Sequence, residues 1–175
     1  WRKINRLCLL NGVLMLEITQ DVQVKYENNL LSVKGKLGEV IRKIDLNTQV
    51  TLDSKSVTFA SKTKALTYTH EAHLKNAFLG VTVGYKKKLK MIYAHFPMTI
   101  EIKGKDIAIK NFLGEKQPRK AIIRGNVKME VKGQEVFISG CDKEAVGATI
   151  SNIRTALKIK YKDSRVFQDG LYVIE

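Results

Sequence analysis

The chain has few cysteines, few aromatic side chains and few acidic side chains for its 175 residues. Cys8 and Cys141 lie far apart with no second pair, which excludes a disulfide framework and a four-cysteine zinc site within one chain. Aromatic residues make up 7% of the sequence, so contacts with a phosphate backbone are favoured over a platform that stacks single-stranded bases. We expect both cysteines to be reduced, as in a cytosolic protein.

The motifs of several enzyme classes are also missing. Gly80 to Gly84 follows a predicted helix instead of preceding one, so it is no phosphate-binding loop, and no Gly-x-Ser-x-Gly motif occurs. His70 and His73 are three residues apart, whereas zinc proteases space these ligands by four, so a solvated first helical turn is expected around them. We predict no enzyme, no metal and no cofactor. A zinc hydrolase built on His70, Glu71 and His73 stays an alternative.

Basic and apolar residues near the N-terminus imitate a signal peptide. Asn11-Gly12 interrupts the apolar run, polar residues follow from Glu17, and the run is shorter than the ~20 residues that a bilayer requires. We therefore expect neither secretion nor membrane insertion. Residues 1–14 are instead predicted to be part of a packed first strand, or to precede a start at Met15.

Basic side chains outnumber acidic ones by 31 to 17, a net charge of +14, and residues 82–124 alone hold 11 Lys and Arg against 3 acids. So much uncompensated charge repels itself unless a polyanion binds, and nucleic acid is the first candidate. A solvated face is the alternative for any single lysine, because exposed charges contribute little to stability. Three clusters, expected in edge strands or loops, are the candidate phosphate contacts: Lys86, Lys87, Lys88 and Lys90; Lys116, Arg119, Lys120 and Arg124; and Lys158, Lys160, Lys162 and Arg165.

The sequence repeats itself with an offset of 76 positions, which aligns residues 22–39 with residues 98–115. Apolar residues alternate in both segments, so each is predicted to be a hairpin, with turns at Asn28-Asn29 and Gly104-Lys105. A second pair of strands repeats as well, at residues 50–59 and 127–138.

Each half then changes to a helical period. Apolar residues recur with this spacing over residues 74–81 and again over residues 146–157. Thr69 and Asp142 are the predicted helix N-caps, and Glu144 in the first turn supports the second.

These patterns predict an α+β protein of two tandem homologous domains, each an antiparallel sheet packed against one helix. The joint is expected near Phe96-Pro97, because a proline cannot donate to a strand ladder. The predicted domains are residues 1–96, with 1–14 as an uncertain extension, and residues 97–175, expected to be the main RNA-binding domain.

Three motifs in the second half give the chain a family resemblance. They are Tyr93-Ala94-His95-Phe96-Pro97, the run from Asn111 to Lys116, and the ending from Arg165 to Val173. In these residues the sequence resembles the universal large-subunit ribosomal protein six, called protein nine in eukaryotes, in its archaeal and eukaryotic branch. The resemblance runs from about residue 69 to the end and is weaker over residues 22–68, where Lys36-Leu37 departs from the family pattern.

The resemblance implies a structural protein of the cytoplasmic ribosome, near the base of the factor-binding stalk and the sarcin-ricin loop. Its implied partners are large-subunit ribosomal RNA and neighbouring large-subunit proteins, with no membrane and no small-molecule substrate. A free RNA-binding or RNA-remodelling module is the alternative. Besides the three basic clusters, the resemblance adds His95, Gln168 and Gly170 to the expected ribosomal RNA contacts.

Overall fold

The computed structural model describes residues 9–10, 13–17, 22–46, 48–53, 56–61, 63–160, 162–163 and 165–174. The prediction for residues 1–14 falls mostly outside these ranges, although Val13–Glu17 forms strand β2. Cys8 also lies outside the described residues. Neither described helix is both long enough and apolar enough to span a membrane.

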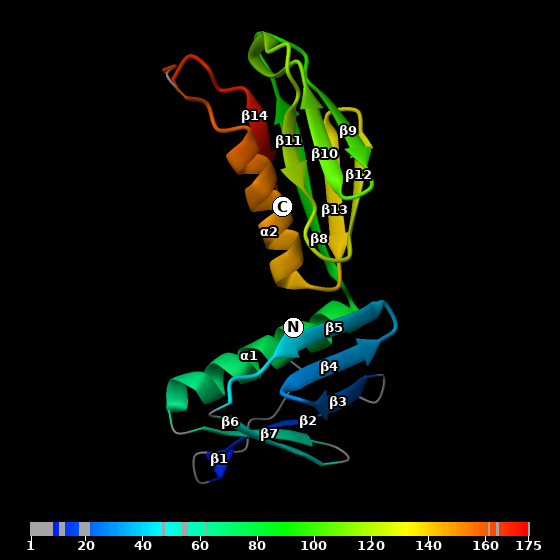
Figure 1. The fold of residues 1–175 in the computed structure, drawn as a ribbon, viewed down its shortest axis with the longest axis vertical. Coiled ribbons are helices and arrows are strands. Elements are labelled where there is room, and N and C mark those ends of the chain that lie inside the picture. Colours follow the sequence, from blue (N-terminus) through cyan, green and yellow to red (C-terminus); the bar gives the residue numbers. More distant parts are fainter. Residues whose placement is uncertain are drawn as a thin grey trace. The chain divides into compact units, whose positions relative to one another are not determined.

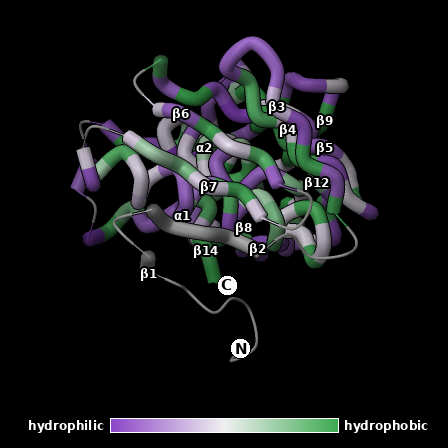
Figure 2. The backbone as a smooth tube through the Cα atoms, turned by 90° about the horizontal axis from the view of Figure 1, so that it is seen from below, coloured by the Kyte–Doolittle hydropathy of each residue, from purple (hydrophilic) through white to green (hydrophobic). Residues whose placement is uncertain are grey.

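The chain divides into two compact units, Trp1–Gly84 and Tyr85–Glu175. Within the described residues, each contains one α-helix, a four-stranded sheet and a three-stranded sheet, and all described strand pairs are antiparallel. The predicted α+β class with two repeated units is therefore confirmed, with two sheets in each unit where one was predicted. Along the strands the backbone colour in Figure 2 changes repeatedly between hydrophobic and hydrophilic, as one buried and one exposed face require.

The first unit pairs its strands in the orders β1-β2-β7-β6 and β3-β4-β5 (Figure 1). Asn28 and Asn29 both have positive φ, which the tight turn of the β3–β4 hairpin requires and which asparagine tolerates. The predicted turn there is confirmed. The elements of this unit are β1 Leu9–Leu10, β2 Val13–Glu17, β3 Gln23–Glu27, β4 Leu30–Gly35, β5 Gly38–Lys43, β6 Thr48–Leu52, β7 Ser56–Ser61 and α1 Lys64–Thr82.

The second unit repeats this strand arrangement with the orders β12-β13-β8-β14 and β11-β10-β9, except that its edge strand β14 follows the helix whereas β1 precedes the other strands of the first unit. Gly104 has φ +62° in the β9–β10 turn, so the second predicted hairpin is also confirmed. The elements are β8 Tyr85–Ile92, β9 Thr99–Lys103, β10 Asp106–Lys110, the short helix η1 Phe112–Gly114, β11 Arg119–Ile122, β12 Val127–Lys132, β13 Glu135–Gly140, α2 Lys143–Ala156 and β14 Gly170–Val173.

The boundary between the units lies between Gly84 and Tyr85, not at Phe96-Pro97. Strand β8 explains the difference, because it pairs with β13 on one side and β14 on the other. It is the first strand of the second unit, in the position that β2 holds in the first. The sequence pattern showed a strand after helix α1, but its partners lie far along the chain.

The two helices bury the predicted apolar stripes. Leu74, Phe78 and Val81 of α1 are at most 5% exposed and belong to the core of the first unit. Val146 and Ile153 of α2 join the core of the second unit, which also contains the inner residues of both of its sheets. Helix α2 packs against β11 and β13, so it contacts both sheets.

Helix α1 begins at Lys64, five residues before its predicted N-cap at Thr69. The Thr69 hydroxyl donates instead to the Ala65 carbonyl within the helix, at 2.8 Å. Its first turns bury polar residues, Thr67, His70 and Glu71, which a search for an apolar stripe cannot find. The expected solvated turn around His70 is therefore wrong.

His70 and Glu71 are 8% and 4% exposed. The Glu71 carboxylate forms an ion pair with Lys75 one turn later, which compensates for its burial. The His70 ring lies 5.9 Å from the Phe59 ring, and burial lowers the pKa of His70 below 6.5 although nearby Asp45 raises it in part. Among the described residues no group of three or more candidate metal ligands occurs.

Asp142 should prove a true helix cap. Its carboxylate accepts a hydrogen bond from the Glu144 amide at 3.0 Å, so we expect Asp142→Ala to lower the free energy of unfolding by about 1 kcal/mol in urea denaturation. Thr69→Ala is the matched control, with an expected change within about 0.5 kcal/mol. Equal losses in both variants would contradict the helix start at Lys64.

His70 should make the protein less stable in mild acid. Below pH ~6.5 the unfolded chain binds a proton at this histidine, whereas the folded chain, with its lowered pKa, does not until the pH is lower still. The free energy of unfolding should therefore fall as the pH drops from about 7 to 5.5, and His70→Gln should flatten this decline. Urea titrations at several pH values measure it, and an unchanged slope in the variant would exclude His70 as its source.

Candidate RNA-binding surface

The predicted basic residues lie at several places on the second unit. Lys86, Lys88 and Lys90 are alternate residues of β8, of opposite parity to the buried Leu89 and Met91, so they share the outer face of the four-stranded sheet. Strand β8 is third in the order β12-β13-β8-β14, so the expectation that this cluster occupies an edge strand or loop is wrong. Lys87 has the opposite parity but is exposed near the start of the strand.

One end of the second unit gathers most of the other predicted contacts. We call it the loop end and define it as residues 93–97, 111–118, 158–160, 162–163 and 165–169; in Figure 1 the green loop after β10 and the orange-to-red segment after α2 lie there. An exposed side chain is found at each of His95, Lys116, Lys158, Lys160, Lys162, Arg165 and Gln168. Gly170 differs, because it is buried as the first residue of β14.

The acidic groups at the loop end are engaged within the protein. Asp163 accepts a hydrogen bond from the Arg165 amide at 2.9 Å. Asp169, 3% exposed, accepts one from the Ala94 amide at 2.8 Å. Lys116, Lys158 and Lys160 form no ion pair with any described residue. The loop end is therefore a surface whose cations remain exposed while its acids hold the backbone.

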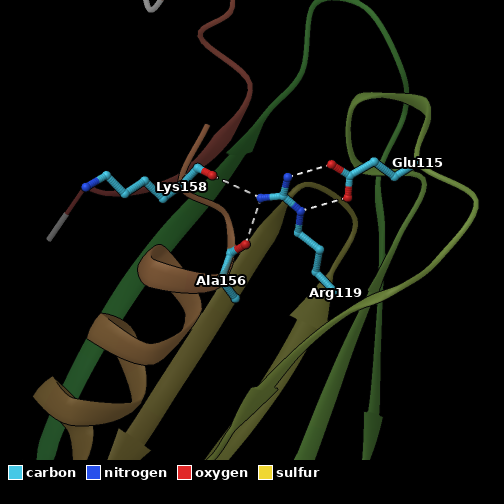
Figure 3. Close-up of polar contacts among 4 residues, drawn as sticks. All are labelled: Glu115, Arg119, Ala156 and Lys158. Atoms are coloured by element: carbon cyan, nitrogen blue, oxygen red, sulfur yellow. Dashed lines mark hydrogen bonds and ion pairs between the residues drawn. The ribbon is translucent and has the colours of Figure 1, made fainter. Parts of the chain in front are cut away.

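Arg119 joins the loop of residues 111–118 to the end of α2 and the segment that follows it (Figure 3). Its Nε and Nη2 donate to the two Glu115 carboxylate oxygens at 2.8 and 2.5 Å. Its Nη1 donates to the carbonyls of Ala156 and Lys158 at 2.9 and 3.1 Å, and its guanidinium lies 4.5 Å from the Phe112 ring centroid. This hydrogen bonding raises the pKa of Arg119 and lowers that of Glu115.

These bonds occupy the guanidinium, so Arg119 positions the loop end and we leave it out of the proposed RNA contacts. Lys120 and Arg124 are exposed, whereas Arg119 is partly buried. Lys120 lies on β11, an edge strand of the three-stranded sheet, as predicted for that cluster. Arg124 follows β11, with its amide donating to the Thr149 hydroxyl at 3.0 Å.

Aromatic residues that the charge pattern did not reveal also hold the loop end. His95 and Phe167 stack with ring centroids 4.8 Å apart, and the Lys162 ammonium lies 4.5 Å from the Phe167 centroid. His95 Nδ1 is 3.6 Å from the buried Asp169 carboxylate. The stack thus joins residues 93–97 to the segment after α2. In the sequence only the motif resemblance points to these two residues, because the composition does not single them out.

The chain from Asn111 to Gly114 has an unusual backbone. Asn111, Leu113 and Gly114 all have positive φ, which is uncommon for a leucine. The side-chain amide Nδ2 of Asn111 donates to the Pro97 carbonyl at 2.9 Å, and a Cβ at Gly114 would lie 3.3 Å from the Phe96 ring. The first two of the three motifs of the family resemblance, residues 93–97 and 111–116, are therefore packed on each other.

Arg119 should contribute to stability in a way that lysine cannot replace. Arg119→Ala leaves Glu115 and two carbonyls without their donor, so we expect the free energy of unfolding to fall by roughly 2 kcal/mol. Arg119→Lys should lose most of this, because an ammonium cannot form the same fork. Urea denaturation measures both, with Lys120→Ala as an exposed neighbour expected to change little. Full stability in Arg119→Lys would show that charge alone suffices.

Comparison with known proteins agrees with the motifs. A family model for ribosomal protein L6 matches residues 96–170. The large ribosomal subunit protein uL6 of Methanobrevibacter smithii is 43% identical over 91% of this chain and 93% of its own length. The uL6 proteins of Methanosarcina mazei and Haloarcula marismortui are 40% and 39% identical, covering 91% and 90% of this chain and 94% and 92% of their own lengths. The chain belongs to the ribosomal protein L6 (uL6) family.

Proposed function

We propose that this chain is a structural protein of the large ribosomal subunit that binds ribosomal RNA mainly through the loop end of its second unit. Family membership supports the ribosomal role, which is structural and not enzymatic, in the cytoplasm. The family resemblance further supports a position near the base of the factor-binding stalk and the sarcin-ricin loop. Neighbouring large-subunit proteins are the other proposed partners.

The observation that carries the proposal is the imbalance of charge at the loop end. Exposed cations extend from the segment after α2 to Lys116, whereas Glu115, Asp163 and Asp169 bond to groups of the protein itself. RNA phosphates would supply the anionic partners that these cations lack among the described residues. Such contacts release counterions and fix the position of the protein without reading sequence.

Prior ordering of the loop end favours binding. Arg119 ties the end of α2 to residues 111–118, and the His95–Phe167 stack ties the segment after α2 to residues 93–97. RNA then meets cations whose backbone is already fixed, so less conformational entropy is lost on association. Gln168 supplies a polar side chain beside them. Gly170 contributes through the backbone at the start of β14, and Lys120 and Arg124 extend the basic surface along β11.

The loop-end cations should bind RNA without stabilising the fold. We expect Lys160→Ala, Lys162→Ala and Arg165→Ala together to weaken binding to the cognate ribosomal RNA. The slope of log K against the logarithm of the salt concentration should become less steep by roughly two to three. The melting temperature should change little, because exposed charges contribute only ~0–1 kcal/mol. Binding titrations at several salt concentrations measure the first effect, and thermal unfolding the second.

A matched control removes three exposed lysines of the first unit, Lys25, Lys34 and Lys43, one from each strand of its three-stranded sheet. This variant should keep most of the affinity. A greater loss of RNA affinity in this variant than in the loop-end variant would place the main RNA-binding surface on the first unit. Sedimentation of the native protein on a sucrose gradient separates the ribosomal role from a free RNA-binding module, since only the former places it with the large subunit.

A further inference from the structure

The outer face of the four-stranded sheet in the second unit lies on the side away from the core. Cross-strand pairing arranges its side chains in three rows, which we call the outer sheet face. Buried partners such as Leu89, Val136 and Leu171 alternate with them and point to the core. The rows are Lys128, Ser139 and Lys86; Glu130, Phe137 and Lys88; and Lys132, Glu135, Lys90 and Tyr172.

This face carries five lysines and two glutamates. Both glutamates have partners: Glu135 lies 2.6 Å from the Lys88 ammonium and Glu130 lies 3.6 Å from that of Lys132. Lys86, Lys90 and Lys128 are exposed and form no ion pair with any residue that the structure describes. The face therefore has a positive excess distributed over three neighbouring strands.

An aromatic ring lies in the middle row. Phe137 is partly exposed on an otherwise polar surface, and the ammonium groups of Lys88 and Lys132 lie 5.7 and 5.6 Å from its centroid. Tyr172, 45% exposed, lies in the next row on β14, and its hydroxyl is held by the Gln168 carbonyl at 3.0 Å. A flat array of this kind offers a surface for stacking, surrounded by cations.

We propose that the outer sheet face binds an unpaired segment of RNA, with one base stacked on Phe137 and the flanking phosphates on Lys86, Lys90 and Lys128. The proposal deepens the proposed function and rests on it, adding a contact separate from the loop end. Lys88 and Lys132 lie near the ring while they form ion pairs with Glu135 and Glu130, and a cation at such a surface site binds a ring more weakly than a stacked base does, so a base can take their place over the ring.

Charge and shape favour RNA over a protein partner. An apolar protein surface would bury three lysines that have no acidic partner among the described residues, at a large desolvation penalty. A regular duplex would meet the lysines through its phosphates but would leave the ring without a base to stack on. Antiparallel sheets that present aromatic rings beside basic residues are a known solution for unpaired bases. The low aromatic content of the whole chain does not exclude this, because one ring at the centre of the face suffices for one base.

The test compares Phe137→Leu with Phe137→Tyr in the full-length protein. The probes are a fluorescein-labelled oligoadenylate and an RNA duplex of mixed sequence, titrated at one salt concentration. Leucine keeps an apolar side chain but no ring, so affinity for oligoadenylate should fall about tenfold, whereas tyrosine should retain it. Affinity for the duplex should be unchanged in both variants. Replacing Lys86, Lys90 and Lys128 together with glutamine should weaken binding to oligoadenylate as well.

Two results would overturn the proposal. If Phe137→Leu binds oligoadenylate as the unchanged protein does while the lysine variant is weakened, the face binds phosphates alone. If neither variant changes binding, the face does not bind RNA. Circular dichroism and thermal unfolding verify that the variants are folded, and Phe137→Tyr serves as the folded reference if leucine disturbs the sheet. The proposed function fails separately, through loss of co-sedimentation with the large subunit or through unaltered RNA binding in the loop-end variant.

Discussion

The fork of hydrogen bonds from Arg119 is the interaction on which the loop end depends. Its guanidinium donates hydrogen bonds to the Glu115 carboxylate in the preceding loop and to two carbonyls at and just after the end of α2. It also lies over the Phe112 ring. Without it, the segments that carry Lys116 and Lys158 would lose their direct link to each other, although the contacts of Asn111 and of the His95–Phe167 stack would remain. Each would then lose conformational entropy when RNA binds, and the charge of the loop end would be spread over many arrangements.

Much of the fold could be predicted from the sequence because its signals are local. The alternation of apolar residues and the asparagine and glycine turns identify the β3–β4 and β9–β10 hairpins, and helical spacing identifies the buried faces of α1 and α2. The role of β8 could not be predicted in this way. Its alternation shows that it is a strand, but only its pairing with β13 and β14 shows which unit it completes. That pairing joins residues distant in sequence and leaves no local pattern.

The candidate surface was predictable as charge but not as geometry. Runs of lysine indicated Lys86 to Lys90 and the segment after α2. Arg119 looks like its neighbours in the sequence and differs only in having partners both on the preceding loop and at the end of α2. The acids that leave the surface positive, Glu115 and Asp169, are likewise distinguished by their bonds. Phe137 gives no sequence signal, because its importance comes from its place in the middle row of a basic face.

The position of β8 inside its sheet has a consequence for biosynthesis. The strand is made before either of its partners, and β14 is completed only with residues 170–173. A nascent chain therefore exposes both edges of β8, with Leu89 and Met91 on its apolar side, until those later segments are made. Contacts of such long sequence separation slow folding, so the second unit should fold only when its own translation is nearly finished. Until then the exposed edges of β8 have to be protected from aggregation.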